Sequence, residues 1–260
     1  MPRRFIDLTI GLVGGAMLIW FSTMSVDCQE VTRAVPRTGD GKPDFSGFWE
    51  VLSKADENIE AHSASRGISA SVGIVEGGEL PYQPAALKKR KQNFAARKTA
   101  DTEAKCFLPG VPRIMYVQHP FQIVQTPGLL LMLFEYLHAK RNVFMNGHHL
   151  AGPLDWWMGD SRGSWDGDTL VVDVDNFNDE TWFDRVGNFH SDALHVVERY
   201  TPADVDHINY TATVEDSKVF SRPWRMNLIF YRHKEPNFQL LDYECQAFLL
   251  NDIPLIANKK

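Results

Sequence analysis

The sequence predicts a mostly β fold, an antiparallel barrel with one or two helices at its periphery, and three observations support this. From Cys106 onward, short runs rich in β-branched and aromatic residues alternate with turn signals at the spacing of an antiparallel barrel or sandwich. Thr126-Pro127-Gly128, Asn146-Gly147 and Asp166-Gly167 supply turn chemistry between these runs. The segment from Pro84 to Lys105 instead concentrates helix-forming residues, so it predicts one helix over the barrel mouth or sheet.

The elements follow in chain order, beginning with a strand-like run from Phe45 to Val51. A long loop over 53–78 and the predicted helix come next. We expect Asp166-Gly167 to form the centre of a type I′ hairpin, in which both central residues need positive φ. The remaining predicted strands are 113–118, 121–125, 129–137, 141–145, 156–165, 169–174, 194–200, 207–214, 225–233 and 239–246.

The N-terminal segment predicts export. Arg3 and Arg4 precede an apolar stretch from Leu8 to Thr23 that ends in small and polar residues, which is the order of regions in a signal peptide. The stretch is slightly short for a membrane span of about 20 residues, so an uncleaved anchor through residues 6–24 stays as an alternative. We therefore expect a periplasmic or secreted protein with a signal peptide or anchor over 1–28, a linker over 29–44 and a single β-barrel-like domain over 45–260.

Composition narrows the class of partner. The chain has 260 residues, which is enough to bury a sizeable core, and a formal net charge of -6. Binding a nucleic acid needs a basic face, so this charge argues against a nucleic-acid partner. The one basic run, 88–91, falls in the predicted helix and favours a solvated helix face.

A short segment near the first strand carries a first resemblance. Asp44 to Trp49 (DFSGFW) resembles the Gly-x-Trp entry to the first strand of lipocalin-type (calycin) barrels. In those barrels a tryptophan closes one end around a small ligand. The resemblance implies that this chain forms a calycin-like barrel.

A larger set of segments resembles a broad family of exported, largely uncharacterised bacterial proteins. The segments are RTGDGKPDFSGFWE, CFLPGVPR, FQIVQTPG, the strand pair from Glu135 to Arg141, GDSRGSWDGDTLVVDVDNFNDETW, HSDALHVVERY, EDSKVFSRPW and LLDYEC. The resemblance implies that HSDALHVVERY and GDTLVVDVDNF belong to one domain, but it implies no activity. Asn146 stands where we expect an aspartate, which excludes a catalytic carboxylate at that position.

Glu198 is the first catalytic candidate. Side chains alternate along a strand, so Glu198 shares a face with Leu194 and Val196 and points inward if that apolar face lines the interior. An inward acid in a ligand cavity has a shifted pKa that suits proton transfer. The structural alternative is that Glu198 pairs with an arginine such as Arg141 and fixes the barrel.

Histidines give a second catalytic hypothesis. His190 or His195 could act as a general base that is oriented by Asp192 or Glu198. Nucleophilic catalysis has little support, because the Gly-x-Ser-x-Gly form at Gly159–Gly163 lacks the following helix that a nucleophile elbow needs.

Charged and aromatic residues mark a candidate ligand site. Glu135 shares a strand face with Leu131 and Leu133, and since a buried charge needs a partner, a structural Glu135/Arg141 pair is favoured over catalysis. A subset of the tryptophans would line an apolar pocket. The candidate ligand-binding residues are Glu135, Arg141, Trp157, Trp165 and Arg199.

Metal binding has no regular motif in this sequence. No HExxH or HxH spacing is present, and an EF-hand loop that starts at Asp173 fails because Asn178 takes the place of its glycine. We therefore predict no metal and no organic cofactor. A zinc site assembled from distant loops and an irregular calcium site in Asp173–Glu180 stay as alternatives.

Cys106 and Cys245 are the cysteines of the predicted folded domain. An oxidising compartment would let them pair, and the bond would close a long loop, worth up to about 4 to 5 kcal/mol on the chain-entropy model. Two buried free thiols are the alternative.

Three functional hypotheses follow. The first is an exported β-barrel protein that binds a small hydrophobic or aromatic molecule in its cavity. The second is a cofactor-independent lyase, isomerase or cyclase that uses inward Glu and His side chains for proton transfer. The third is an interaction subunit held at a membrane by its N-terminal segment.

Overall fold

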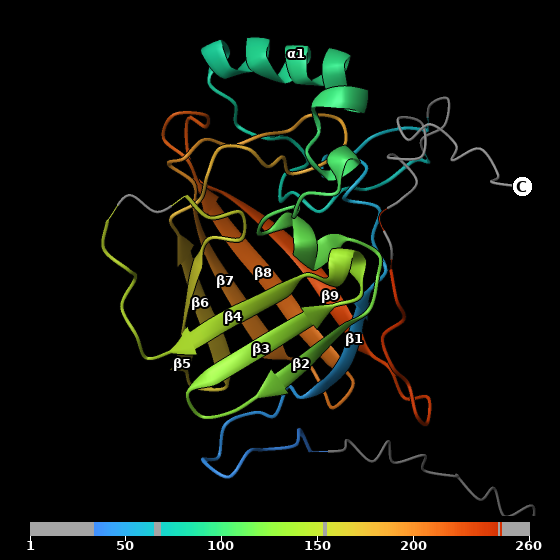
Figure 1. Cartoon of the computed structure of the whole chain (residues 1–260), viewed down its shortest axis with the longest axis vertical. Helices are drawn as coiled ribbons and strands as arrows, with labels where there is room; N and C mark the ends of the chain where they lie inside the picture. The colour runs from blue at the N-terminus through green and yellow to red at the C-terminus, as the bar shows by residue number, and fades with distance from the viewer. Residues whose placement is uncertain (1–33, 65–68, 153–154, 244, 246–260) are drawn as a thin grey trace, which may run out of the picture. The chain divides into compact units, whose positions relative to one another are not determined.

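The computed structural model describes residues 34–64, 69–152, 155–243 and 245. Within these residues, nine strands form a closed barrel, and β1 pairs with β9 to complete the ring (Figure 1). The elements are β1 (Gly47–Val51), helix α1 (Pro84–Ala100), the 3-10 turns η1 (Glu103–Lys105) and η2 (Arg113–Tyr116), β2 (Phe121–Gln125), β3 (Leu129–Phe134), the 3-10 turn η3 (Tyr136–His138), β4 (Lys140–Met145), β5 (Asp160–Asp166), β6 (Thr169–Asp175), β7 (His195–Pro202), β8 (His207–Glu215) and β9 (Trp224–Arg232). The predicted mostly β barrel with a peripheral helix is confirmed.

The predicted leader, 1–28, and the anchor alternative, 6–24, lie outside the described residues. In the part of the chain that the structure describes, no helix has the length and apolar character needed to span a bilayer. Residues 34–44, at the end of the predicted linker, fold against the barrel. The Arg37 guanidinium donates two hydrogen bonds to the carboxylate of Asp168 in the β5–β6 turn, at 2.7 and 2.8 Å.

Strands β4 and β5 depart from the predicted antiparallel pairing. They run parallel from Val143 beside Ser161 to Met145 beside Gly163, whereas the other neighbouring pairs are antiparallel. A parallel pair needs a crossover connection, which here is the segment between Met145 and Asp160. Gly163 permits the close approach, because a Cβ there would lie 2.5 Å from the Met145 sulfur.

Alternation along the strands fills the barrel interior with side chains. Val196, Glu198 and Tyr200 of β7 are buried, while the residues between them are only half-buried. Trp49 of β1 is also buried; its ring nitrogen donates to the Phe45 carbonyl at 2.8 Å, and the Arg232 guanidinium lies 4.1 Å from its ring centre. Gly47 has φ of 130°, and a Cβ there would lie 2.5 Å from the Arg232 guanidinium.

Helix α1 lies at one end of the barrel, and it is shorter than predicted (Figure 1). It ends at Ala100 because the next acidic residues turn away to bind Arg113, which is 1% exposed. Asp101 accepts two hydrogen bonds from Arg113 at 3.0 Å each, and Glu103 contacts the same guanidinium.

The predicted strand 113–118 is wrong, because the same buried salt bridges hold Arg113 in a 3-10 turn. Residues 113–116 are buried on all sides in a 3-10 turn, without the alternation of a strand.

Other predicted strand bounds also need correction. The strand 129–137 ends at Phe134, because Glu135 takes helical backbone angles. The strand 156–165 starts only at Asp160, since the residues before it belong to the crossover. The described part of 239–246 contains no strand; the barrel closes through β1 and β9, so this segment has no free edge to join.

The predicted hairpin at Asp166-Gly167 forms, but with a different turn centre. Asp166 pairs with Thr169, so Gly167 and Asp168 are the two central residues. Of these only Gly167 has positive φ, at 60°. A positive φ at the first central position alone is the requirement of type II′, so the predicted type I′ turn is wrong.

Candidate functional site

A charged network occupies the barrel interior where β4, β5, β7 and β8 face one another. Arg141 donates to Glu198 through Nη1 at 3.0 Å and contacts its other carboxylate oxygen through Nη2. Its Nε donates to the Ser161 hydroxyl at 3.0 Å. The hydroxyls of Tyr200 and Tyr210 donate to Glu198 at 3.1 and 2.9 Å. We call these five residues the interior network.

Burial governs the electrostatics of the interior network. It raises the pKa of Tyr200 and Tyr210 well above the ordinary value, and the Glu198 charge adds to this effect. Burial opposes the charge of Arg141, but the attraction of Glu198 outweighs it and holds the pKa of the guanidinium above its usual range. Glu198 therefore points inward as predicted, and the alternative that it pairs with Arg141 is confirmed.

Glu135 does not join the interior network, so the predicted Glu135/Arg141 pair is wrong. In β3 the buried residues are Leu130, Met132 and Phe134, whereas Glu135 lies beyond the end of the strand, where the chain turns into η3. Its carboxylate lies 3.2 Å from His119 Nδ1 and accepts the Leu241 backbone N–H at 2.9 Å.

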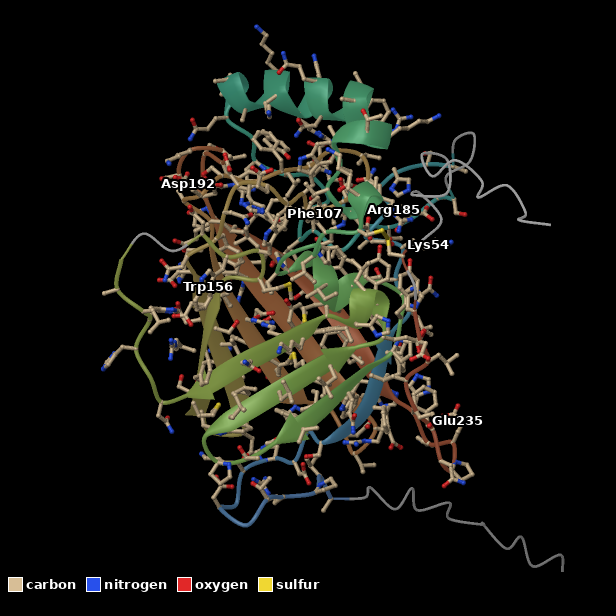
Figure 2. The ribbon with its side chains drawn as sticks, viewed as in Figure 1. Lys54, Phe107, Trp156, Arg185, Asp192 and Glu235 are labelled. Atoms are coloured by element: carbon tan, nitrogen blue, oxygen red, sulfur yellow. A yellow bond between two sulfur atoms is a disulfide. The ribbon has the colours of Figure 1, made fainter. Side chains whose placement is uncertain are left out.

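The predicted catalytic histidines occupy two different environments. His190 is buried; its Nδ1 lies 2.9 Å from the Ser191 carbonyl and its Nε2 lies 2.6 Å from the Thr181 hydroxyl. Burial lowers the pKa of His190, in keeping with a neutral ring. Asp192, which was expected to orient it, is instead exposed near the end of the barrel that carries α1 and pairs with Lys218 (Figure 2).

His195 lies on the outer face of the barrel wall, opposite to Glu198. Its Nε2 lies 3.0 Å from Asp173 Oδ1, and this hydrogen bond raises the pKa of His195 despite partial burial. The hypothesis that Glu198 orients His195 is therefore wrong, because the two side chains point to opposite faces of β7.

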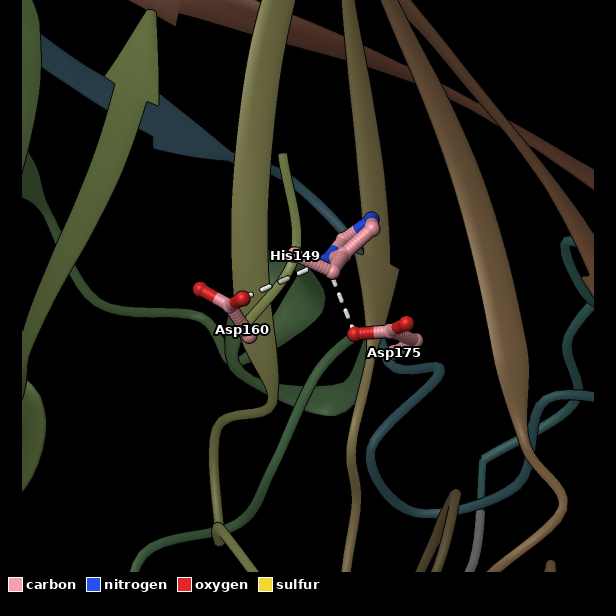
Figure 3. A group of neighbouring side chains, drawn as sticks. All are labelled: His149, Asp160 and Asp175. Atoms are coloured by element: carbon pink, nitrogen blue, oxygen red, sulfur yellow. Dashed lines mark hydrogen bonds and ion pairs between the residues drawn. The ribbon is translucent and has the colours of Figure 1, made fainter. Parts of the chain in front are cut away.

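The outer face around His195 holds a second polar group, which we call the outer cluster: His149, Asp160, Asp173, Asp175 and His195. His149 comes from the β4–β5 crossover, and its ring lies between Asp160 and Asp175 (Figure 3). Its Nδ1 lies 3.3 Å from Asp160 Oδ2 and 2.8 Å from Asp175 Oδ1, while its Nε2 lies 2.8 Å from Asp173 Oδ1. One potential ligand atom from each of His149, Asp160 and Asp175 lies within 4.8 Å of the others.

The carboxylates of the outer cluster differ in their electrostatics. Hydrogen bonds from His195 and His149 lower the pKa of Asp173. Burial raises the pKa of Asp175. Asp160 is fixed by Arg162, whose Nε and Nη2 donate to Oδ2 at 3.1 and 3.0 Å, and by the Leu150 backbone N–H at 2.9 Å.

An aromatic pocket of about 450 Å³ lies beside the β4–β5 pair. Trp157 lines it and stacks on Phe107 with ring centres 5.0 Å apart. Trp156, at the left side of the barrel in Figure 2, and Phe144 also line it and are 38% and 42% exposed. The pocket lining is Leu108, Lys140, Arg141, Asn142, Phe144, Asp155, Trp156, Trp157, Met158, Gly159, Asp160 and Ser161.

The last predicted ligand residues lie elsewhere. Trp165 stacks on Phe45 with ring centres 5.8 Å apart and lines a separate pocket of about 360 Å³. Arg199 points to solvent and pairs with Asp166 at 2.7 Å. The structure therefore brings Arg141 and Trp157 to one pocket, but not Trp165 or Arg199.

The predicted disulfide between Cys106 and Cys245 is confirmed. The two cysteines are 139 residues apart, so the bond ties the chain near its C-terminal end to the segment between η1 and η2.

The sequence prediction did not bring His149, Asp160, Asp173 and Asp175 together; Asp173 and Asp175 lie in the segment of the calcium alternative, which named no partner outside Asp173–Glu180. The alternation in Asp173-Val174-Asp175 was a usable signal, because it puts both carboxylates on one strand face. His149 and Asp160 carried no such signal, since their position depends on the crossover and the parallel β4–β5 pair.

No protein-family model matches this chain, and no curated protein matches it at a significant level. The two resemblances in the sequence therefore stay predictions.

Proposed function

We propose that this is an exported β-barrel protein that binds a small molecule with a flat apolar or aromatic body in the pocket beside β4 and β5. The observation that carries this proposal is the set of large aromatic side chains around one concavity. Trp156 and Phe144 are partly exposed there, although burial of such rings is strongly favourable. A volume of about 450 Å³ falls within the usual range for small-molecule pockets.

The barrel axis gives less support for a ligand than this pocket does. Trp49, Tyr200, Tyr210 and the Arg141–Glu198 pair are all buried, and they point into the barrel. A ligand on the axis would have to displace a hydrogen-bonded ion pair, which is costly. The pocket on the wall needs no such displacement.

Polar residues around the pocket suggest what else the ligand carries. Lys140, Asn142 and Asp155 line it together with the aromatic rings. A few polar groups in an apolar pocket fix the orientation of a ligand. We therefore expect a ligand that has one or two polar substituents on its flat body.

The proton-transfer alternative at Glu198 has little support. One carboxylate oxygen accepts from both tyrosine hydroxyls and from Arg141, and the other contacts the second guanidinium nitrogen. A general base needs a free lone pair within reach of the substrate. The side chain is also 0% exposed, so a substrate has no direct access to it.

The test uses a fluorescent aromatic probe, 1-anilinonaphthalene-8-sulfonate, titrated into the native protein. We expect saturable binding to the wild type and at least about a tenfold loss of affinity in Trp156→Ala, equivalent to about 1.4 kcal/mol. Leu52→Ala is the matched control, because Leu52 is 69% exposed and lines a different groove; it should bind as the wild type does. Equal affinity in Trp156→Ala and wild type would contradict the proposal. Native mass spectrometry of protein from its own host then identifies the bound compound.

A further inference from the structure

We propose that the outer cluster binds one divalent transition-metal ion, with Zn²⁺ as the preferred ion, through His149 Nδ1 and one carboxylate oxygen each from Asp160 and Asp175. The three side chains come from the crossover, the start of β5 and the end of β6, and they converge on one point (Figure 3). This inference does not rest on the proposed ligand pocket.

The first argument is an unsatisfied oxygen. Among the residues that the structure describes, none donates a hydrogen bond to Asp175 Oδ1, which is shielded from solvent, although His149 Nδ1 lies only 2.8 Å away. The same nitrogen lies 3.3 Å from Asp160 Oδ2. A ring nitrogen offers one hydrogen or one lone pair in the ring plane, so it cannot serve two carboxylates in different directions. A cation between these three atoms would give Asp175 Oδ1 and the Nδ1 lone pair a partner, beside Asp160 Oδ2, which Arg162 and the Leu150 N–H already hold.

The second argument is the partner of the other ring nitrogen. His149 Nε2 lies 2.8 Å from Asp173 Oδ1, and His195 Nε2 contacts the same oxygen at 3.0 Å. A histidine that ligates a metal usually donates its other N–H to a carboxylate, which fixes the tautomer and the ring orientation. With the proton on Nε2, the Nδ1 lone pair faces Asp160 and Asp175, and that arrangement is repulsive unless a cation lies between them.

The third argument is charge and rigidity. Asp160, Asp173 and Asp175 bring three carboxylates to the outer cluster, and Arg162 pairs with Asp160. Among the described residues of the cluster, negative charge is therefore in excess when the histidines are neutral. Arg162 and the Leu150 N–H also hold Asp160 in place, as ligating carboxylates are commonly held by hydrogen bonds. Such preorganisation lowers the cost of assembling a metal site.

The donor set selects the class of ion. One imidazole nitrogen and two carboxylate oxygens suit Zn²⁺ and related transition metals better than Ca²⁺, which takes six to eight oxygens. The side chains of His149 and Asp175 are 25% and 37% exposed, so water can complete the coordination shell. The ligand atoms span up to 4.8 Å, and metal bonds of about 2.0–2.2 Å require only a small inward movement of the exposed side chains.

Isothermal titration of EDTA-treated full-length protein with Zn²⁺ tests the assignment. We expect one ion per chain in the wild type and loss of binding by more than about 100-fold in His149→Ala and in Asp175→Asn. Asp173→Asn keeps the three ligands and should weaken binding by about 10- to 100-fold. His207→Ala is the matched control, because His207 pairs with Asp204 outside the cluster and should leave the affinity unchanged.

Two further readouts separate metal binding from a loss of fold. Cobalt(II) in place of Zn²⁺ should give visible absorption bands in the wild type that are absent in His149→Ala, and the far-UV circular dichroism of both proteins should agree. If His149→Ala fails to fold, Asp175→Asn carries the test, since its side chain is more exposed. Absence of Zn²⁺ binding in the wild type, equal binding in Asp175→Asn, or a preference for Ca²⁺ would each overturn the proposal.

Discussion

The interior network and the outer cluster lie on opposite faces of the barrel, where both take residues from β5 and β7, and their charged groups differ in how completely they are paired. On β6, Val172 and Val174 point inward while Asp173 and Asp175 point outward. On β7, Glu198 points inward and His195 outward. In the interior network each side-chain nitrogen and oxygen has a partner, whereas in the outer cluster no described residue donates a hydrogen bond to Asp175 Oδ1.

This difference indicates two roles. A fully paired charge in a dry interior can stabilise one arrangement of strands, but it has no bonding capacity left for a ligand. A half-exposed group with an unsatisfied oxygen retains that capacity. Our proposals therefore assign folding to the inner face of these strands and binding to the outer face.

Removing one partner of the interior network should have the largest effect. Glu198→Gln leaves the Arg141 charge buried without a counter-ion, so we expect the free energy of unfolding to fall by about 3–5 kcal/mol. Asp173→Asn on the outer face should cost less than about 1 kcal/mol in metal-free buffer. Urea denaturation of both variants measures the contrast.

A double variant sharpens this test. Arg141→Met with Glu198→Leu removes both charges together, and it should recover much of the stability that Glu198→Gln loses. A loss of less than about 1 kcal/mol in Glu198→Gln would show that the ion pair is not the main interaction at this point, and the contrast between the two faces would fail.

The pH dependence of stability should report on His190, which is buried. Burial lowers the pKa of His190 in the folded chain below the unfolded value of about 6.5. As the pH falls through this value, the unfolded chain therefore binds a proton that the folded chain does not bind. His190 should therefore destabilise the fold as pH falls below about 6.5, by no more than about 1.4 kcal/mol at pH 5.5.

The measurement is urea unfolding at pH 7.5 and 5.5 with EDTA present. His190→Asn should lose this part of the pH dependence, while His207→Asn, whose ring is 39% exposed, should keep it. An identical pH dependence in His190→Asn and wild type would contradict the assignment of a neutral buried ring.

Strand alternation explains which parts of the fold and site could be predicted. It put Glu198 inward, because Glu198 lies within a regular strand where every second residue is buried. Arg141 was predicted only as a possible partner of Glu198 or Glu135, and it lies on the buried face of β4. It failed for Arg113, where a buried salt bridge and a 3-10 turn override the pattern, and for Glu135, where the strand has already ended.

The outer cluster could not be predicted, because it depends on long-range pairing. His149 lies beside Asp160 because the crossover folds back over the start of β5. The position of Asp160 is in turn set by the parallel pairing of β5 with β4. Local sequence carries the alternation of Asp173 and Asp175, but it carries no information about which loop lies over them.

The smallest effect should come from Arg199, which lies on the outer face of β7 away from the outer cluster. Its ion pair with Asp166 has side chains 40% and 69% exposed, so solvent screens the charges and ordering the side chains offsets much of the gain. Arg199→Ala should change the free energy of unfolding by less than about 0.5 kcal/mol, and added salt should abolish that difference. A loss above about 1 kcal/mol in the same urea experiment would mean that outer-face charges also hold the barrel together, and folding and binding would then not be divided between the two faces of the wall.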